Sequence, residues 1–315
     1  MTPRKLNGAD LAYLRYQLAK GRSYRDLATE LGMHHSTIGE FVKANAPDLA
    51  REPDRPQGEL SVAESRPMKL LVIDIETMAN LAWTWGTWDQ NIAPAQIVKH
   101  KRVLSWAAKW YGNTAVEFFS EFRDGREDMV RQAWDRLNAA DGVIGYNSKK
   151  FDVKHLNTEF FVDGLTPPAP FAHIDLLQTV RKEFAFGSNK LAAVADRLGI
   201  GSKLEHEGFA LWLKCEAGDA QAWKRMEAYN RQDVVLTEQL YKTILPWITS
   251  HPSYAAFAHS EMPMCPNCGH EPLNPSGYHH ARTRAYLRYH CPACGHWARD
   301  RHAQVITETT ETSSY

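Results

Sequence analysis

The sequence predicts an α/β fold, a mixed sheet flanked by helices, together with a small all-helical domain and a small metal-stapled module. Three observations predict it. An apolar run at 70–73 ends in two carboxylates, strand-like segments precede and then alternate with helical ones, and two C-x-x-C pairs follow. The expected parts are a helical domain (1–46), a linker (47–68), the main domain (69–250), a cysteine module (261–302) and a disordered tail (303–315).

Composition excludes several classes of protein. Lys plus Arg and Asp plus Glu number 37 each, so nucleic-acid binding must come from local patches and metal ions rather than from net charge. Residues 1–22 lack the pattern of a signal peptide, and no apolar run approaches the roughly 20 residues of a membrane span. Five cysteines, four of them paired, fit a reducing compartment. We expect a soluble cytoplasmic protein without a membrane partner.

The first domain is expected to hold three short helices within residues 8–45. A stretch similar to a capping box opens the second helix, and Gly32 ends it. The spacing is similar to that of the helix-turn-helix motif, which predicts DNA binding; a plain three-helix bundle is the alternative. Residues 1–68 carry 10 basic and 9 acidic side chains, a weak charge for gripping phosphates. The residues that carry the spacing are Ala28, Gly32, Ile38 and Phe41.

Two carboxylates, Asp74 and Glu76, end a run that is typical of a strand buried on both faces. Side chains two positions apart on a strand share a face, so both carboxylates point the same way. Because crowded, desolvated carboxylates repel, they ionise together only when cations neutralise them. Mg²⁺ and Mn²⁺ prefer such oxygen ligands. The alternative is that Asp74 caps the strand end and Glu76 is solvated.

Asp152 follows a second short buried strand at 142–146 and opens a helix. Catalytic groups are commonly placed at such strand ends, although Asp152 alone is equally a favourable first-turn residue. Asn147 and the lysines nearby, including Lys150, can contact phosphate or sugar groups. This segment therefore predicts a third acidic ligand beside substrate contacts.

Tyr229 and Asp233 lie four residues apart in a helical run over 219–241, which places them on one face. A tyrosine and a carboxylate on a core-facing stripe need a polar partner, and metal with water would supply one. A buried tyrosine with a local hydrogen bond is the alternative.

Three tryptophans, Trp83, Trp85 and Trp88, closely follow the first carboxylates in a segment expected to be a strand over 81–88. They could stack on an unpaired terminal base, while packing in the core is the commoner role. The charged stretch 99–102 either grips phosphates or forms a solvated loop.

As a set, D-x-E, N-x-x-x-F-D and Y-x-x-x-D resemble the DEDD exonuclease superfamily, the DnaQ-like branch of the ribonuclease-H-like fold. The tyrosine resembles that of the DEDDy subgroup. The second motif is similar to that of proofreading domains of family B polymerases and of stand-alone exonucleases. The resemblance covers about residues 69–245 and implies a 3′→5′ exonuclease that releases nucleoside 5′-monophosphates by a two-metal-ion mechanism.

The resemblance also implies roles for individual residues. The catalytic ones would be Asp74, Glu76, Asp152, Tyr229 and Asp233. The four acidic side chains would hold two Mg²⁺ or Mn²⁺ ions, with Asp74 bridging both, and Tyr229 would orient the attacking water. The expected substrate contacts are Asn147, Lys150 and Phe151.

Partners follow from the same resemblance. Single-stranded or 3′-end DNA is the expected substrate, and a replication or recombination protein is an expected partner in a bacterial or phage-infected cell. Two alternatives stay open. One is a DNA-binding regulator whose nuclease-like domain is only a scaffold, and the other is an RNA-processing exoribonuclease on the same fold.

The two C-x-x-C pairs predict a structural zinc site. Each turn directs two thiolates at one ion, with glycine behind the second cysteine, and the module resembles zinc ribbons. Disulfides are the alternative. The arginines and aromatics of the module suggest either a nucleic-acid surface or a cap on the main domain. We expect removal of zinc to unfold 261–302 and leave the main domain folded. The ligands would be Cys265, Cys268, Cys291 and Cys294.

Overall fold

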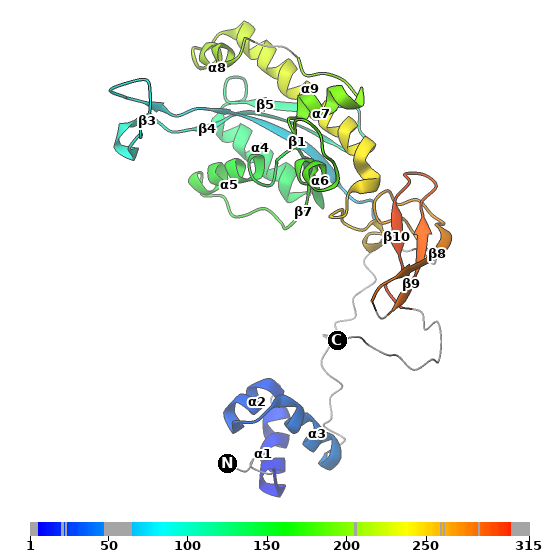
Figure 1. Ribbon diagram of the computed structural model, residues 1–315. Coiled ribbons are helices and arrows are strands. Elements are labelled where there is room, and N and C mark those ends of the chain that lie inside the picture. Colours follow the sequence, from blue (N-terminus) through cyan, green and yellow to red (C-terminus); the bar gives the residue numbers. More distant parts are fainter. Residues whose placement is uncertain are drawn as a thin grey trace. The chain divides into compact units, whose positions relative to one another are not determined.

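The computed structural model describes residues 6–19, 22, 24–46, 65–204, 207–258, 260, 262–282 and 284–303. The chain forms two compact units, 1–64 and 65–315 (Figure 1). Most of the expected linker and nearly all of the expected tail lie outside the described residues. Within the described ranges, no helix combines the length and the apolar character that a membrane crossing requires.

Among its described residues, the first unit contains three helices around a small apolar core. Its second helix ends at Gly32, whose φ of +64° is left-handed, and the N–H of Met33 donates to the carbonyl of Ala28 at 2.9 Å. This is the Schellman geometry that lets the chain turn sharply into the next helix. DNA binding by the third helix stays a prediction. The helices are α1 (Gly8–Ala19), α2 (Tyr24–Leu31) and α3 (His35–Asn45).

The second unit is built on a five-stranded mixed sheet in the order β5-β4-β1-β6-β7. Its first three strands in the chain pair antiparallel, while the last two run parallel to β1. This mixed sheet flanked by helices confirms the predicted fold class. The strands are β1 (Leu70–Met78), β4 (Arg102–Trp110), β5 (Glu117–Ser120), β6 (Gly142–Gly145) and β7 (Ala172–Asp175).

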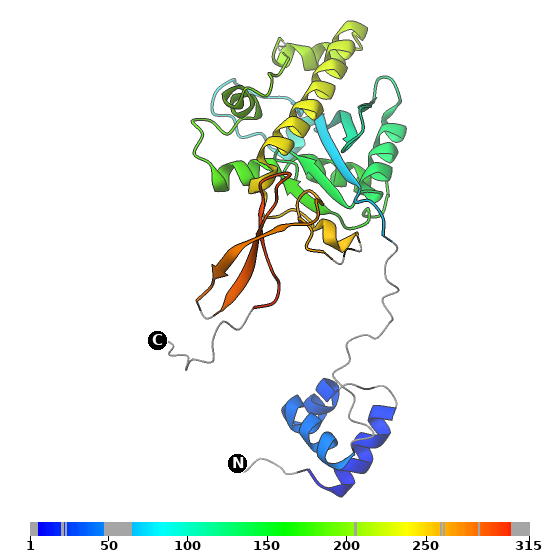
Figure 2. The same ribbon diagram turned by 90° about the vertical axis from the view of Figure 1, so that its right-hand side faces the viewer.

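Helices cover both faces of the sheet, so the unit has three layers (Figures 1 and 2). The apolar side chains of α4 and α5 pack on one face, and those of α6, α7 and α9 pack on the other. The helices are α4 (Arg126–Asn138), α5 (Asp152–Val162), α6 (Leu176–Glu183), α7 (Leu191–Leu198), α8 (Phe209–Glu216) and α9 (Ala220–Ile244).

The alternation along β1 decides which layer receives the carboxylates. Leu70 and Val72 pack in the layer of α9, while Leu71 and Ile73 pack in the layer of α4 and α5. Since side chains two positions apart share a face of a strand, the even-numbered residues that follow point towards α9. The alternation of side chains along β1 therefore places Asp74 and Glu76 on the face of the sheet that α9 covers.

The prediction of a strand over residues 81–88 is wrong. Only β2 (Leu81–Ala82) pairs, with β3 (Ile97–Lys99), and a loop with the short helix η2 (Pro94–Gln96) joins them. The tryptophans of this loop are 78–99% exposed, so the alternative that they pack in the core is also wrong. The aromatic residues imitate a strand pattern although their side chains do not pack on a sheet.

The cysteine module docks on the C-terminal end of α9. The Asn267 side chain donates to the carbonyls of Leu245 (2.9 Å) and Ile248 (2.7 Å), and His296 Nδ1 donates to the Pro246 carbonyl at 2.8 Å. These bonds attach the module to the turn that directly follows α9, which supports the cap alternative. Beyond α9 lie η3 (Leu245–Trp247), η4 (Tyr254–Ala256), β8 (Asn274–His280), β9 (Ala285–His290) and β10 (Trp297–Arg299).

Candidate active site

Three carboxylates converge where β1 passes α9. The ligand oxygens of Asp74, Glu76 and Asp233 all lie within 4.8 Å of one another. Asp233 is 1% exposed, and the other two are half-buried. Asp233, which lies more than 150 positions after Asp74 and Glu76 in the sequence, therefore joins them in one acidic cluster.

Asp152 lies beside this cluster but outside the 4.8 Å group. It is the first residue of α5, is 4% exposed, and its Oδ1 accepts the N–H of Ile75 at 3.1 Å. Ile75 stands between the two β1 carboxylates in the sequence. The hydrogen bond therefore ties the start of α5 to the D-x-E segment of β1.

A tight turn delivers Asp152 to that position. Asn147 has a left-handed φ of +67°, and its N–H donates to Asp175 Oδ1 at 2.9 Å. A Cβ on Gly145 would meet the Cβ of Ser148 at 2.5 Å, so only glycine fits there. Asp175 also accepts the N–H groups of Lys149 and Leu177, which ties β7 to the turn. Buried Asp175 is thus a positioning residue that sequence reasoning missed.

The acidic cluster is poorly suited to carrying its charges alone. Burial of the carboxyl group, followed by repulsion from Asp152, Glu76 and Asp233, raises the pKa of Asp74 well above its ordinary range. Burial and then repulsion from Asp233 raise the pKa of Glu76 to about 8, and burial raises that of Asp152 to about 7. Such groups ionise together when cations neutralise them. Their hard oxygen donors fit Mg²⁺ or Mn²⁺.

Lys203 faces the cluster from the loop between α7 and α8. Its Nζ pairs with Asp233 Oδ2, donates to the Tyr229 hydroxyl at 3.2 Å, and lies 5.1 Å above the centre of the tyrosine ring. Burial lowers the pKa of Lys203, but the ion pair with Asp233 outweighs this effect and raises it above the ordinary value. Lys203 therefore stays charged. No local pattern in the loop marks it, so the sequence could not identify it.

Asn230 is a second residue that sequence reasoning missed. It is fully buried, and its Nδ2 donates to Asp74 Oδ2 at 2.7 Å and to the Asp74 carbonyl at 3.1 Å. Its Oδ1 accepts the Ser105 hydroxyl at 3.3 Å, which fixes the orientation of the amide. Asn230 thereby holds the Asp74 carboxylate at one rotamer. The sequence could have indicated Asn230 only through its position directly after Tyr229.

A pocket of about 560 Å³ opens beside the carboxylates. Tyr229 meets its wall, since the rings of Trp212 and Tyr229 are 6.4 Å apart in an edge-on arrangement. Among the described residues, the lining contains none of the three expected substrate contacts. The lining residues are Glu76, Thr77, Ala79, Asn80, Lys101, Gly208, Phe209 and Trp212.

The expected substrate contacts lie near the start of α5. Asn147 lies in the turn between β6 and α5, Lys150 is exposed, and the Lys101 ammonium lies 5.2 Å above the ring of Phe151. Their contact with substrate stays a prediction.

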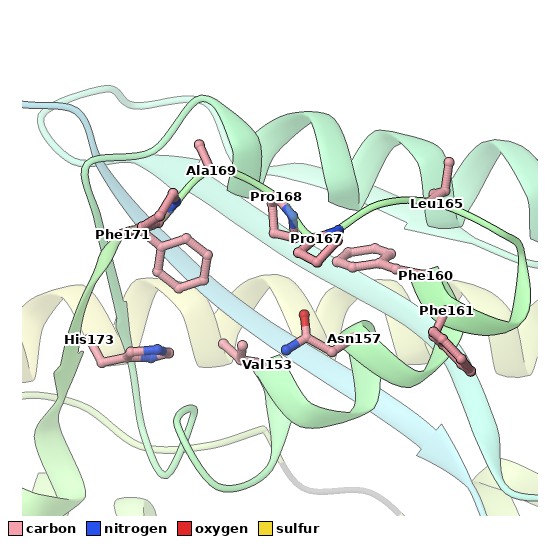
Figure 3. Close-up of a pocket in the computed structure, with 11 residues that line it drawn as sticks. Val153, Asn157, Phe160, Phe161, Leu165, Pro167, Pro168, Ala169, Phe171 and His173 are labelled. Atoms are coloured by element: carbon pink, nitrogen blue, oxygen red, sulfur yellow. The ribbon is translucent and has the colours of Figure 1, made fainter. Parts of the chain in front are cut away.

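A separate apolar cavity of about 450 Å³ lies between α5 and the loop that leads to β7. Figure 3 shows Phe171 and His173 on one side of it, with Pro167 and Phe160 further along. It contains none of the five expected catalytic residues. We assign it no part in the active site.

The four cysteines of the module form the second candidate metal centre. Their Sγ atoms all lie within 4.8 Å of one another, with 3.7 Å between Cys265 and Cys294 and 3.6 Å between Cys268 and Cys291. A tetrahedral site with Zn–S bonds of about 2.3 Å requires sulfur atoms roughly 3.8 Å apart. A disulfide requires about 2.05 Å, and all four thiols are free. The donor set fits Zn²⁺, and the disulfide alternative is wrong for this structure.

Comparison with known proteins gives one family match. The family model RNase_H_2, described as RNase H superfamily, matches residues 71–245. Among solved structures, the chain is similar to the family B DNA polymerase from the hyperthermophilic archaeon Pyrobaculum calidifontis, at 20% identity and a TM-score of 0.45. The alignment covers 62% of this chain and 28% of that polymerase, so the chain spans less than a third of the polymerase's length. No curated protein matches the sequence significantly.

Proposed function

The chain belongs to the RNase H superfamily, and on this premise we propose that it is a DEDDy-type 3′→5′ exonuclease acting on unpaired DNA ends. Membership in the superfamily supports a nuclease. The observation that carries the finer proposal is the convergence of Asp74, Glu76 and Asp233 within 4.8 Å beside an open pocket. Asp152 completes the acidic set, and Tyr229 lies one helical turn before Asp233.

The reaction is hydrolysis of the terminal phosphodiester bond. Water adds to phosphorus, the bond to the 3′-oxygen breaks, and a nucleoside 5′-monophosphate leaves. Two Mg²⁺ or Mn²⁺ ions, held by the four acidic residues, would lower the pKa of the attacking water and stabilise charge on the leaving oxygen. The residues that would hold them are Asp74, Glu76, Asp152 and Asp233.

The chain's own residues prepare this site. Asn230 fixes the Asp74 carboxylate through its 2.7 Å hydrogen bond. Lys203 holds the Tyr229 hydroxyl at 3.2 Å and places a positive charge beside Asp233, where it would stabilise negative charge on a phosphate bound at the carboxylates. Burial and the charge of Asp233 raise the pKa of Tyr229 to about 12, so its hydroxyl keeps its proton and orients the water by hydrogen bonding.

The first unit and the cysteine module are proposed to bind DNA or a protein partner. The first unit exposes residues of α3 as a helix-turn-helix would, and the four cysteines of the module would hold one structural Zn²⁺ as in a zinc ribbon. Both would recruit DNA or a replication or recombination protein to the nuclease. The exposed residues of α3 and its start include His34, His35, Ser36, Thr37, Glu40 and Lys43.

The test of the function is digestion of a 5′-labelled single strand in the presence of Mg²⁺. We expect a ladder that shortens one nucleotide at a time, nucleoside 5′-monophosphates as products, and no digestion when an inverted nucleotide blocks the 3′ end. The same strand made of RNA shows whether ribose is accepted. A strand left intact, or internal cuts in the blocked strand, would contradict the proposal.

Lys203 is expected to contribute to the rate of hydrolysis. We expect Lys203→Ala to lower the single-turnover rate about 10- to 100-fold, because the variant loses a preorganised charge and frees the Tyr229 hydroxyl. Lys203→Arg should recover part of the rate. Lys214→Ala is the matched control, since that lysine is 48% exposed and pairs with Glu207. An unchanged rate in Lys203→Ala would remove the residue from the mechanism.

A further inference from the structure

A hairpin over residues 81–99 carries an unusual concentration of exposed aromatic surface. Trp83, Trp85 and Trp88 are 78%, 99% and 85% exposed, and Figure 1 shows the hairpin of β2 and β3 extending away from the main sheet. A tryptophan normally buries a large part of its surface, and contiguous exposed apolar surface marks an interaction site. Three such side chains within six positions therefore indicate a binding surface.

The hairpin holds its shape without packing these rings. Trp83 donates its backbone N–H to the Gln96 carbonyl at 3.0 Å, and the Gln96 side chain donates back to the Trp83 carbonyl at 2.9 Å. The Gln90 side chain donates to the Trp88 carbonyl at 2.7 Å. Polar backbone contacts thus order the loop and leave the indole rings for a ligand.

The hairpin is continuous with the catalytic pocket. Ala79 and Asn80 precede β2, Lys101 follows β3, and all three line the pocket that reaches Glu76. Asn80 Oδ1 accepts the N–H of Lys101 at 2.6 Å, which closes the base of the hairpin. A polymer whose end lies at the carboxylates therefore meets the hairpin at the pocket rim.

The chemistry of the hairpin favours unpaired bases over phosphates. Residues 81–99 contain one acidic residue, Asp89, and one basic residue, Lys99, which pairs with Glu216 at 2.8 Å. A duplex hides its base faces and is held mainly through its phosphates, whereas an unpaired strand offers flat faces that stack on indole rings. Within the described part of the chain, Lys101 has no carboxylate within ion-pair distance and can meet a phosphate.

We propose that the hairpin 81–99 is a stacking platform for the unpaired bases that lead to the 3′ end held at the carboxylates. This inference rests on the proposed nuclease function and specifies its substrate as a single strand of several nucleotides. The tryptophans bind the strand and stay outside the reacting site, so they control affinity for long substrates rather than the chemical step.

The test compares two substrates. One is a single strand of about 12 nucleotides with phosphorothioate linkages, used for binding; the other is the p-nitrophenyl ester of thymidine 5′-monophosphate, which reaches the carboxylates alone. We expect Trp85→Ala and Trp88→Ala each to weaken strand binding about 10-fold, with ester hydrolysis unchanged. Phe161→Ala is the control, since that ring is 83% exposed on α5.

The outcomes separate the platform from the proposed function. Unchanged strand affinity in both tryptophan variants, at unchanged Tm, would overturn the platform. Variants that keep their affinity for the strand but no longer bind a protein partner would also overturn it. A changed slope of log Kd against log salt would assign the loss to charge and overturn stacking. Failure of the wild type to hydrolyse either substrate would overturn the nuclease function, while weaker strand binding by the variants would still support the platform.

Discussion

Asp74→Asn is expected to lower the rate of phosphodiester hydrolysis by about 10³-fold or more. Asp74 lies in the centre of the acidic cluster, where it interacts electrostatically with Asp152, Glu76 and Asp233. Loss of its charge would weaken the hold of the acidic residues on the proposed ions, and metal ions contribute several kcal/mol of transition-state stabilisation, which corresponds to roughly this factor. Single-turnover digestion of the labelled strand measures the effect.

The same variant should be no less stable than the wild type when metal is absent. Without metal, folding must either bury the Asp74 charge among like charges or protonate the group, whose pKa is raised mainly by burial, and asparagine avoids both costs; we therefore expect Tm in EDTA to rise by a few degrees. Mg²⁺ should raise the Tm of the wild type and have a smaller effect on Asp74→Asn, because ligands that bind only the folded state stabilise it. Asp135→Asn, an exposed position on α4, is the control. Full activity in Asp74→Asn would contradict the assigned site.

Loss of zinc from the cysteine module is expected to destabilise the whole second unit. Structural Zn²⁺ contributes an apparent binding free energy of about 10–16 kcal/mol in small domains. The sequence alone predicted that chelation unfolds only residues 261–302. Because Asn267 and His296 bond the carbonyls that follow α9, unfolding of the module also exposes the end of the helix that carries Tyr229 and Asp233.

Chelation and Cys291→Ser should each remove zinc, lower the Tm of the second unit and increase hydrogen exchange at the C-terminal end of α9. Metal analysis, far-UV circular dichroism and exchange mass spectrometry measure these effects. Cys215→Ala is the control and should keep one zinc ion per chain, because Cys215 lies in α8 outside the cluster. Asn267→Ala should keep zinc but still lower Tm. Purified protein without zinc, or full stability after chelation, would contradict the prediction.

Much of the fold follows from local patterns. The apolar run of β1, the glycine that ends α2 and the period of α9 each reflect contacts within a few residues, so a single sequence can reveal them. The C-x-x-C turns are local in the same sense, because each one orients two thiols by itself. The 81–88 segment failed as a strand because aromatic content signals a strand only when the residues have a sheet face to cover.

The sequence by itself determined that Asp74 and Glu76 share a face, that Tyr229 and Asp233 share a helix stripe, and that four thiols can meet one ion. Only the tertiary structure decided which face of the sheet α9 covers, that Lys203 and Asn230 reach this cluster, and that the module caps α9. The physical reason is separation along the chain. Periodicity and turn chemistry act over a few residues, whereas Asn230 lies 156 positions from Asp74 and meets it only when the layers pack.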